Sequence, residues 1–423
     1  MLGADGRGAI ARGLGRAYGD AAQNAGGVVV DTTGFASDIV VDAERAQVTL
    51  DAGVSLDTLL DRLLPHGLFV RVTPGTRFVT VGGAIAADVH GKNHHVDGAF
   101  CEHVVSFDLL TPTGEVRTAS RDRDSDVFWA TAGGMGLTGV VLRATLELER
   151  VESASMLVDT ERASDLDDAL ARFRDRDDAF RYSVAWIDCL ARGRRLGRSV
   201  LMRANPARLV DLPETTRRSP LTAPRRLQLR TPPWVPGGLV NRWATAAFNE
   251  AYYRAAPSEE HGRLQSIDRY FYPLDSIRDW NRLYGRNGFL QYQFVVPLGE
   301  ENALRAVLER LSGAGCPAFL AVLKRFGREE GLISFPMPGW TLALDIPASF
   351  PGLGPLLDGI DVLVAESGGR VYLAKDSRLR PELLEQMYPR LDAWREIQAR
   401  LDPDARMQSD LARRLSLVRR RVA

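Results

Sequence analysis

Three glycine-rich segments, all before residue 140, constrain the fold more than any other feature of this sequence. They are residues 11–20 (ARGLGRAYGD), 73–95 (TPGTRFVTVGGAIAADVHGKNHH) and 129–139 (WATAGGMGLTG). Glycine lets the backbone bend so that consecutive amides point at one anion. One such segment alone could equally be a tight turn without a ligand. Three in one region are hard to explain by packing alone, so they predict one domain wrapped around a long ligand with phosphate and ring parts.

The first segment differs from the dinucleotide fingerprint of the Rossmann fold. That fingerprint needs a strand before the glycines and a helix after them. No clear strand precedes residue 11, and residues 26–31 lead directly into a β-prone run. In the second segment, residues 80–83 offer another turn of backbone amides, and the small side chains around Gly82 would let a flat ring lie against the backbone. The length of the implied ligand fits FAD.

The pattern of elements changes near residue 150. Before it, strands are expected at 28–31, 38–41, 47–51, 104–110, 116–119 and 140–149, with a helix at 56–64. After it, helices are expected at 164–174, 301–313, 353–367 and from 381 onward, and strands at 289–298, 318–326 and 340–346. Residues 201–245 hold seven of the 22 prolines, eight arginines, two acids, Trp234 and Trp243. Such a stretch predicts either an exposed linker or a mobile segment at a lipid surface.

Composition excludes several classes of protein. Lys+Arg and Asp+Glu both number 54, and a zero net charge argues against nucleic-acid binding. No apolar run approaches the ~20 residues of a membrane-spanning helix. Cys101, Cys189 and Cys316 form neither a disulfide framework nor a metal motif. Four histidines cluster between residues 90 and 103, yet no carboxylate or cysteine spacing completes a metal site, so no metal is expected.

Several motifs, in order along nearly the whole chain, resemble the vanillyl-alcohol-oxidase/PCMH flavoprotein superfamily. They are ARGLGRAYGD, TVGGAIAADVHGKNHH, FWATAGGMGLTG, GFLQYQFVVP, FLAVLKRFG, SFPMPGW, YLAKDSR and SDLARRL. The resemblance implies an α+β fold with a PCMH-type FAD-binding domain split between residues 1–152 and 370–423. A substrate-binding domain, built on an antiparallel sheet with helices, would occupy residues 153–369. Members usually carry a further β-α-β portion before the first turn, so the first domain is expected to be short.

The resemblance also implies a set of cofactor contacts. The residues expected to touch FAD are Ala11, Arg12, Gly13, Leu14, Gly15, Arg16, Ala17, Tyr18, Gly19, Asp20, Gly75, Thr80, Val81, Gly82, Gly83, Ala87, Asp88, Val89, His90, Leu142 and Tyr372. Many relatives bond the flavin covalently through a histidine of the first turn. Arg16 takes that place here, so dissociable, non-covalent FAD is expected.

The expected catalytic residues are Lys375, His90, Lys92 and Tyr18. Lys375 resembles an essential active-site lysine and would act as a base or bind oxygen. The other interpretation of Lys375 is a surface lysine paired with Asp376. Substrate contacts are expected from Gln291, Gln293, Lys324, Thr341 and Lys375, and the alternative for the two glutamines is a solvated strand face.

The implied activity is FAD-dependent oxidation of the 2-hydroxyl of a polyprenylphosphoryl-β-D-ribose. This would be the first half of an epimerisation that supplies arabinose for the cell-wall arabinan of actinobacteria. A short-chain NADH-dependent reductase is the implied partner, and peripheral association with one side of a membrane is expected. One alternative is an oxidase of the same superfamily acting on a soluble alditol or aldonolactone. Another is a non-catalytic flavin-binding scaffold.

Overall fold

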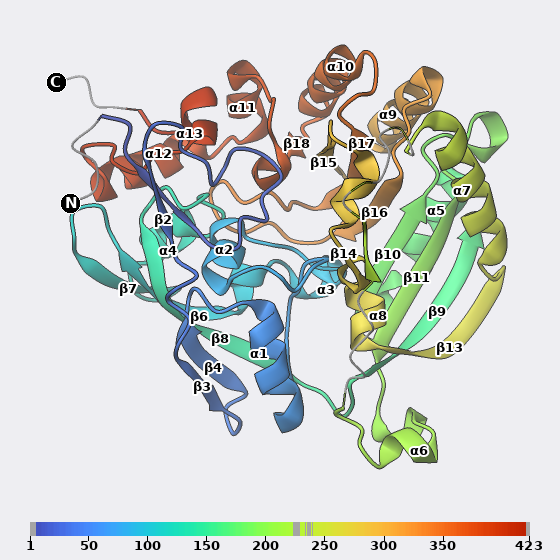
Figure 1. Ribbon diagram of the computed structural model, residues 1–423, viewed down its shortest axis with the longest axis horizontal. Helices are drawn as coiled ribbons and strands as arrows, with labels where there is room; N and C mark the ends of the chain where they lie inside the picture. The colour runs from blue at the N-terminus through green and yellow to red at the C-terminus, as the bar shows by residue number, and fades with distance from the viewer. Residues whose placement is uncertain (1–5, 223–228, 233, 235–237, 239, 420–423) are drawn as a thin grey trace.

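Two antiparallel sheets form the body of the protein (Figure 1). The computed structural model describes residues 6–222, 229–232, 234, 238 and 240–419. Among the described residues, the two termini meet on one side of the molecule, and the chain between them builds first one sheet and then the other. The α+β class expected from the sequence is confirmed.

The first sheet has six strands. Their order is β3 (Ile39–Asp42), β4 (Gln47–Asp51), β8 (Val140–Arg150), β6 (Val104–Leu110) and β7 (Val116–Ser120), and β5 (Leu68–Val70) pairs with β8. The associated helices are α1 (Leu56–Leu63), α2 (Val81–Ala86), α3 (His94–Asp97) and α4 (Ser125–Thr131). Helix α1 begins where the Ser55 hydroxyl accepts the Thr58 amide, and its buried leucines recur every three or four residues, which places them on one face.

The second sheet has eight strands. Their order is β13 (Glu259–Ser266), β9 (Ser155–Ala163), β11 (Ser199–Pro206), β10 (Tyr182–Ile187), β16 (Leu320–Phe326), β17 (Gly339–Pro347), β15 (Phe289–Pro297) and β18 (Arg370–Val371). Helices α5 (Leu166–Arg176), α9 (Glu301–Ala314) and α10 (Leu353–Glu366) pack on one face of it. Helices α6 (Glu214–Arg217), α7 (Arg242–Ala255) and α8 (Ile267–Phe271) lie in its connections.

The chain ends come together beside the first glycine-rich turn. Strand β1 (Ala9–Arg12) pairs in parallel with β2 (Val28–Asp31), and the turn connects them. The C-terminal helices are α11 (Pro381–Met387), α12 (Leu391–Leu401) and α13 (Asp410–Arg414). Ala9 exchanges backbone hydrogen bonds with the segment before α13, and Leu411 of α13 donates its amide to the Asp20 carbonyl. Residues some 400 positions apart in sequence thus support the same turn.

Two expectations from the sequence are wrong. A strand, β1, does precede the first glycine-rich turn; its four residues are too few to show a periodic pattern. Residues 201–245 are not one loop, because the first six belong to the interior strand β11 and the last four begin α7. The proline- and arginine-rich composition is a property of the residues between β11 and α7, and not of the whole segment. Residues 223–228, 233, 235–237 and 239 of this segment lie outside the described residues. A further pair of short parallel strands, β12 (Leu229–Arg230) and β14 (Ile277–Arg278), borders that stretch.

Candidate active site

One face of the eight-stranded sheet carries a group of polar side chains on three adjacent strands. They are Gln291 and Gln293 on β15, Lys324 on β16, and Thr341 and Asp345 on β17. The register places Gln291 opposite Asp345 and Lys324 opposite Thr341, so these side chains share a face. Phe294 and Leu342 point the other way, into the core beneath the helices. The two glutamines are buried, so the expected alternative of a solvated strand face is wrong.

Gln293 connects this face to His90 on the loop that follows α2. Its Nε2 donates to Thr341 Oγ1 and to His90 Nε2, both at 2.9 Å. Thr341 Oγ1 donates its own proton to the Phe294 carbonyl, so it must accept from Gln293, and this fixes which side of the amide faces it. Gln293 Oε1 and His90 Nδ1 are then buried without a partner among the described residues. The site therefore presents one acceptor and one ring N–H donor.

Gln291 and Asp345 form the second polar pair. Gln291 Nε2 donates to Asp345 Oδ1 at 2.5 Å, which leaves Gln291 Oε1 and Asp345 Oδ2 buried and unpaired within the described structure. Burial raises the pKa of Asp345 to about 6, while Gln291 and the nearby Lys375 favour its ionised form. Two buried acceptors thus lie next to a lysine. A carboxyl group with this pKa is mostly charged at pH 7.

Lys375 enters the site from a short helical turn, Leu373–Lys375, that follows β18. Its Nζ lies 5.9 Å from the centre of the Tyr18 ring, and the Tyr18 amide donates to the Ala374 carbonyl. Asp376 does not pair with Lys375. Its carboxylate bonds Arg414 of α13, which also holds Asp20, so the interpretation of Lys375 as a surface lysine paired with Asp376 is wrong.

The amines of Lys375 and Lys324 have pKa values below the usual range for lysine. Burial lowers the pKa of Lys375 to about 8, opposed by the Asp345 carboxylate. Burial lowers the pKa of Lys324 to about 7, and the charges of Lys375 and Lys92 add to this shift. An amine in this range exists partly as the free base near neutral pH, which a proton acceptor requires. Arginine could not replace it, because its guanidinium stays protonated.

The first glycine-rich turn offers free backbone amides. Leu14, Gly15, Arg16 and Ala17 donate no backbone hydrogen bond to any residue that the structure describes, and the turn is largely exposed. The turn packs closely on its surroundings at Gly13, where a Cβ would overlap the Thr80 side chain. Consecutive free amides suit the charged oxygens of a phosphate. The turn therefore fits the pyrophosphate of a dinucleotide such as FAD.

Comparison with known proteins agrees with this geometry. Residues 3–120 match a family described as FAD binding domain. The chain is 44% identical, over 98% of its length, to decaprenylphosphoryl-β-D-ribose oxidase of Mycolicibacterium smegmatis, of which it covers 90%. The chain belongs to this oxidase family. It is also 44% identical over 86% of its length to an uncharacterized protein of Streptomyces coelicolor. A shorter match, 37% identical over 25% of the chain, covers 24% of the mouse L-gulonolactone oxidase.

Membership in the oxidase family makes the protein an FAD-dependent oxidoreductase, so the alternative of a non-catalytic scaffold is dropped.

The second and third glycine-rich segments differ from the first. Val81, Gly82 and Gly83 already donate their amides to Val54 O, Ala52 O and Thr80 Oγ1, so this turn is not the row of free amides that the sequence suggested.

The third segment is explained by packing, contrary to expectation. The amides of Gly133 and Met135 donate to carbonyls of Ile85 and Ala86 in α2, and a Cβ on Gly134 would overlap the Ala130 carbonyl. The segment supports α2 and contributes no free amide at these positions. Of the three glycine-rich segments of this chain, the first is therefore the one that offers a row of free amides within the described structure.

Of the remaining predicted cofactor residues, Tyr372 and Asp88 lie beside His90. Tyr372 Oη donates to the Ala87 carbonyl at 2.8 Å, and its ring lies 5.1 Å from that of His90. Asp88 is buried and accepts from the Cys101 amide, which fixes the backbone before His90. Leu142 is partly buried and accepts the Ala52 amide, whereas Gly75 has open space at its Cβ position. The Tyr372 and Asp88 contacts hold the loop that carries His90. That these residues touch FAD remains a prediction.

Lys92 and Thr341 lie where the expected roles fit them less well. Lys92 Nζ donates to the Tyr270 carbonyl and lies 4.1 Å from the centre of that ring. Thr341 is fully buried and orients Gln293. The structure thus brings Lys375, Tyr18, His90, Gln291, Gln293 and Lys324 to one place, and leaves Lys92 and Thr341 as supports at its edge.

Sequence reasoning missed Asp345 and Arg414. Asp345 is one of 54 acidic residues and no motif marks it. A signal for the lysines was present but unused: the chain has only three lysines, Lys92, Lys324 and Lys375, among 54 basic residues. All three are partly buried and electrostatically coupled. In a chain that otherwise uses arginine, these three positions carry the basic side chain whose amine can lose its proton.

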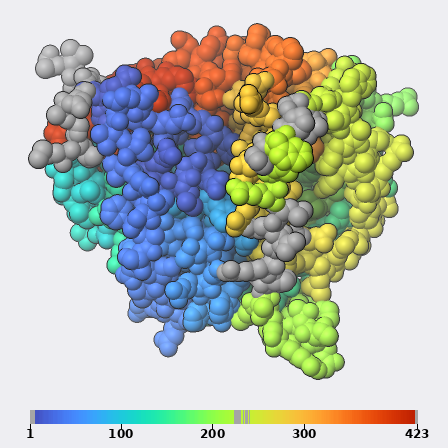
Figure 2. All heavy atoms as spheres, viewed as in Figure 1, coloured from blue at the N-terminus to red at the C-terminus, as the bar shows by residue number. Residues whose placement is uncertain are grey.

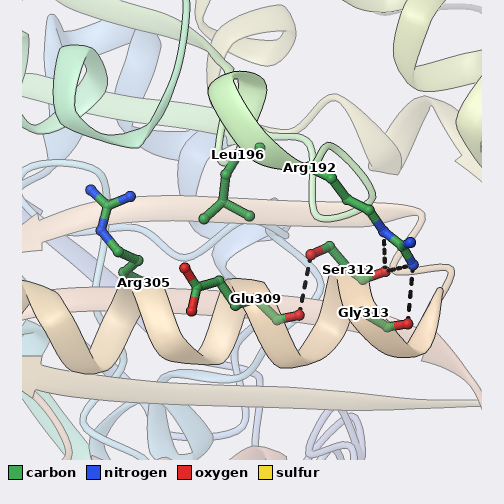
Figure 3. Close-up of a pocket in the computed structure, with 7 residues that line it drawn as sticks. Arg192, Leu196, Arg305, Glu309, Ser312 and Gly313 are labelled. Carbon is green, nitrogen blue, oxygen red and sulfur yellow. Dashed lines mark hydrogen bonds between the residues drawn. The ribbon is translucent and has the colours of Figure 1, made fainter.

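A surface cavity lined by α9 residues offers no competing site. Its volume is about 280 Å³, and it is lined by Arg192, Gly193, Leu196, Arg305, Glu309, Ser312 and Gly313 (Figure 3). Arg192 donates to the Ser312 and Gly313 carbonyls in the last turn of α9, where Ser312 O also accepts the Gly315 amide. The arginine therefore caps the C-terminal end of α9.

Proposed function

We propose that this oxidase converts the 2-hydroxyl of a polyprenylphosphoryl-β-D-ribose to a ketone. The name of the mycobacterial relative supports the substrate class. The observation that carries the proposal is the pair of buried acceptors, Gln291 Oε1 and Gln293 Oε1, that lack donors beside two deprotonable amines. Buried acceptors need hydrogen-bond donors, and the hydroxyls of a sugar supply them. Lys324, when protonated, would attract the phosphate.

The residues of this chain divide the reaction between them. FAD, when bound, would supply the hydride acceptor for the carbon that bears the hydroxyl. Lys375, as a free amine, removes the hydroxyl proton. Gln291 and Gln293 orient the sugar through hydroxyl groups, and His90 presents its Nδ1–H to the same space. Tyr18 closes the site beside Lys375 and packs edge-on against Phe289 at 5.8 Å.

The test is an absorbance spectrum of the purified protein without oxygen. Addition of farnesylphosphoryl-β-D-ribose should bleach the flavin band. The alternative is a soluble alditol or aldonolactone, and the name of the partly matching L-gulonolactone oxidase lends support to an aldonolactone. Bleaching by L-gulono-1,4-lactone or xylitol but not by the lipid-linked sugar would overturn the proposal.

The proposed product also implies a partner. A 2-keto sugar becomes the arabinose epimer only when a hydride is returned to the opposite face. A short-chain NADH-dependent reductase would complete that step, and the epimer would supply cell-wall arabinan. Support for this partner comes from the chemistry of the product alone.

We propose further that the substrate is met at a membrane surface. Within the described residues, no helix is both long and apolar enough to cross a membrane. The connections of the second sheet carry the three most exposed of the large apolar side chains that the structure describes: Val210 is 69% exposed, Trp234 76% and Trp243 77%. Helix α6, next to Val210, projects from the body of the molecule in both views (Figures 1 and 2). Arg208 and Arg218 flank this projection and pair with Asp211 and Glu214, so the exposed Val210 is the feature that favours contact with lipid.

Replacing Val210 with aspartate should weaken binding to phosphatidylglycerol-containing vesicles by about tenfold, because burying a valine contributes about 1.5 kcal/mol. Co-sedimentation measures the bound fraction. Val116→Asp is the matched control, since Val116 on β7 is also exposed but belongs to the other sheet. Equal binding of both variants and the wild-type protein would refute the membrane role of the α6 projection.

The flavin should be dissociable. Arg16, at the position of the flavin-linking histidine of other proteins, has no nucleophile to offer and donates its Nε–H to the Phe78 carbonyl at 3.1 Å. Precipitation with acid should leave the yellow colour in the supernatant. Flavin that stays with the precipitated polypeptide would contradict this prediction.

A further inference from the structure

The proposed reaction assigns no role to the carboxylate of Asp345, which lies within the site. Asp345 is buried in the middle of the polar face, opposite Gln291 on β15 and Leu320 on β16. Its neighbour at i−2, Ala343, is small, so the space on that side of the carboxylate is not filled by its own strand. A buried carboxylate is costly unless charge or hydrogen bonds offset its desolvation.

One of the two carboxylate oxygens of Asp345 has a hydrogen-bond partner within the described structure, and the other has none. Oδ1 accepts from Gln291, and Oδ2 has no partner among the described residues. Tyr18 from the first turn and Tyr284 from the helical turn Trp280–Tyr284 are the titratable neighbours on the far side. Both are neutral phenols near pH 7, and burial raises the pKa of Tyr284 further. The cation that faces Asp345 is Lys375.

Lys375 in turn is surrounded mainly by groups that disfavour its charge. Lys324 on β16 is cationic when protonated, and His90 on the loop after α2 is buried and neutral, with its pKa held well below the usual range by burial and by both lysines. Tyr18 lies beside the amine as a neutral ring, with Arg16 and Asp275 acting on Tyr18 from the outer side. Asp345 is the group that opposes the loss of charge at Lys375.

We propose that Asp345 is a positioning residue that stabilises Lys375 as an ammonium after Lys375 has taken the proton of the substrate hydroxyl. The inference rests on the proposed function and deepens it. In the step, the O–H bond breaks, its proton forms the new N–H bond on Lys375 Nζ, and the oxygen keeps the electron pair that becomes the second bond of the ketone. The hydride that leaves the same carbon is accepted by the FAD of this family. The other neighbours of Lys375 named above, Lys324, His90 and Tyr18, are cationic or neutral. Without Asp345, none of them would stabilise the new positive charge on Lys375.

Asp345→Asn removes the charge and keeps the shape. An asparagine oxygen can still accept from Gln291, so the fold should hold, and the melting temperature and FAD content check it. Asp345→Glu keeps the charge. Thr341→Val, on the same strand and face, disturbs the Gln293 hydrogen bond without changing any charge, and so controls for local disruption.

The primary measurement needs no substrate. Competitive acetylation with trace acetic anhydride, read by peptide mass spectrometry, gives the pH at which each lysine becomes a free amine. The chain's three lysines make the assignment simple. In Asp345→Asn the titration of Lys375 should move to lower pH by about one unit, as expected for loss of one nearby opposite charge. Asp345→Glu and Thr341→Val should titrate as the wild-type protein does.

The same variants are then compared in anaerobic flavin bleaching by farnesylphosphoryl-β-D-ribose. The rising limb of the pH–rate profile should shift to lower pH in Asp345→Asn alone. If Lys375 titrates in Asp345→Asn at the wild-type pH or above it, the inference is wrong. If the wild-type protein fails to oxidise the lipid-linked sugar, the proposed function is wrong, while the acetylation result still decides whether Asp345 controls Lys375.

Discussion

Replacement of Lys375 by methionine should lower the rate of anaerobic flavin bleaching by about 10³-fold, since a positioned general base contributes roughly 10²–10⁴. Lys375 is the amine whose pKa of about 8 leaves a useful fraction of free base at neutral pH. Methionine fills similar volume and cannot accept the proton. Stopped-flow absorbance at the flavin band measures the rate with saturating substrate.

Two further observations make this result specific. FAD content should stay at the wild-type level, because the free amides that fit the pyrophosphate lie in the first turn and not on the Lys375 turn. Lys375→Arg should be as slow as Lys375→Met, because arginine keeps the charge but not the basicity. An active arginine variant would show that Lys375 serves as a fixed cation, and that the proton leaves by another route.

Strong local patterns predicted most of the fold. The strand expected at 104–110 has the same bounds as β6. The helix expected at 301–313 is α9, which extends one residue further. Both carry a clear periodicity of buried side chains. Short elements failed where the decisive contacts come from far along the chain: β1 exists because it pairs with β2 and docks on Met407. Residues 201–206 are a strand because β9 and β10 lie on either side, a fact that proline and arginine density conceals.

Site residues of a type that is rare in this chain could be predicted from the sequence. Site residues of a common type could not. Lys375, Lys324 and His90 stood out by type and motif, and the structure brings them together with Gln293. Asp345 did not stand out, since only the cross-strand register opposite Gln291 shows its place. Glycine density gave a mixed signal. It marks exposed amides in the first turn but close packing of backbone on backbone in the third, and sequence alone does not separate these two uses of glycine.

Gly19→Ala should reduce flavin bleaching by about 100-fold although residue 19 contributes no reactive group, because a displacement of about 1 Å at a catalytic group can cost that much. A Cβ on Gly19 would overlap the Asp376 carbonyl oxygen. That oxygen is backbone, so it can move only with the turn that carries Lys375. The shift would also strain the adjoining hydrogen bond from the Tyr18 amide to Ala374. Stopped-flow bleaching should show a lower maximal rate, with the sugar contacts on β15 intact and the substrate concentration at half-maximal rate little changed.

Gly34→Ala is the matched control, since a Cβ there meets nothing within 4 Å and the residue lies in the same N-terminal region. It should bleach at the wild-type rate. The Arg414 clamp gives an independent check on the mechanism of the Gly19 effect, because Arg414 ties Asp20 and Asp376 together from α13. If steric displacement of the Lys375 turn is the cause, Arg414→Met should slow bleaching in the same way and add little to Gly19→Ala in the double variant. Fully additive losses would mean that the two residues act on different parts of the site, and that Gly19 does not work through the lysine.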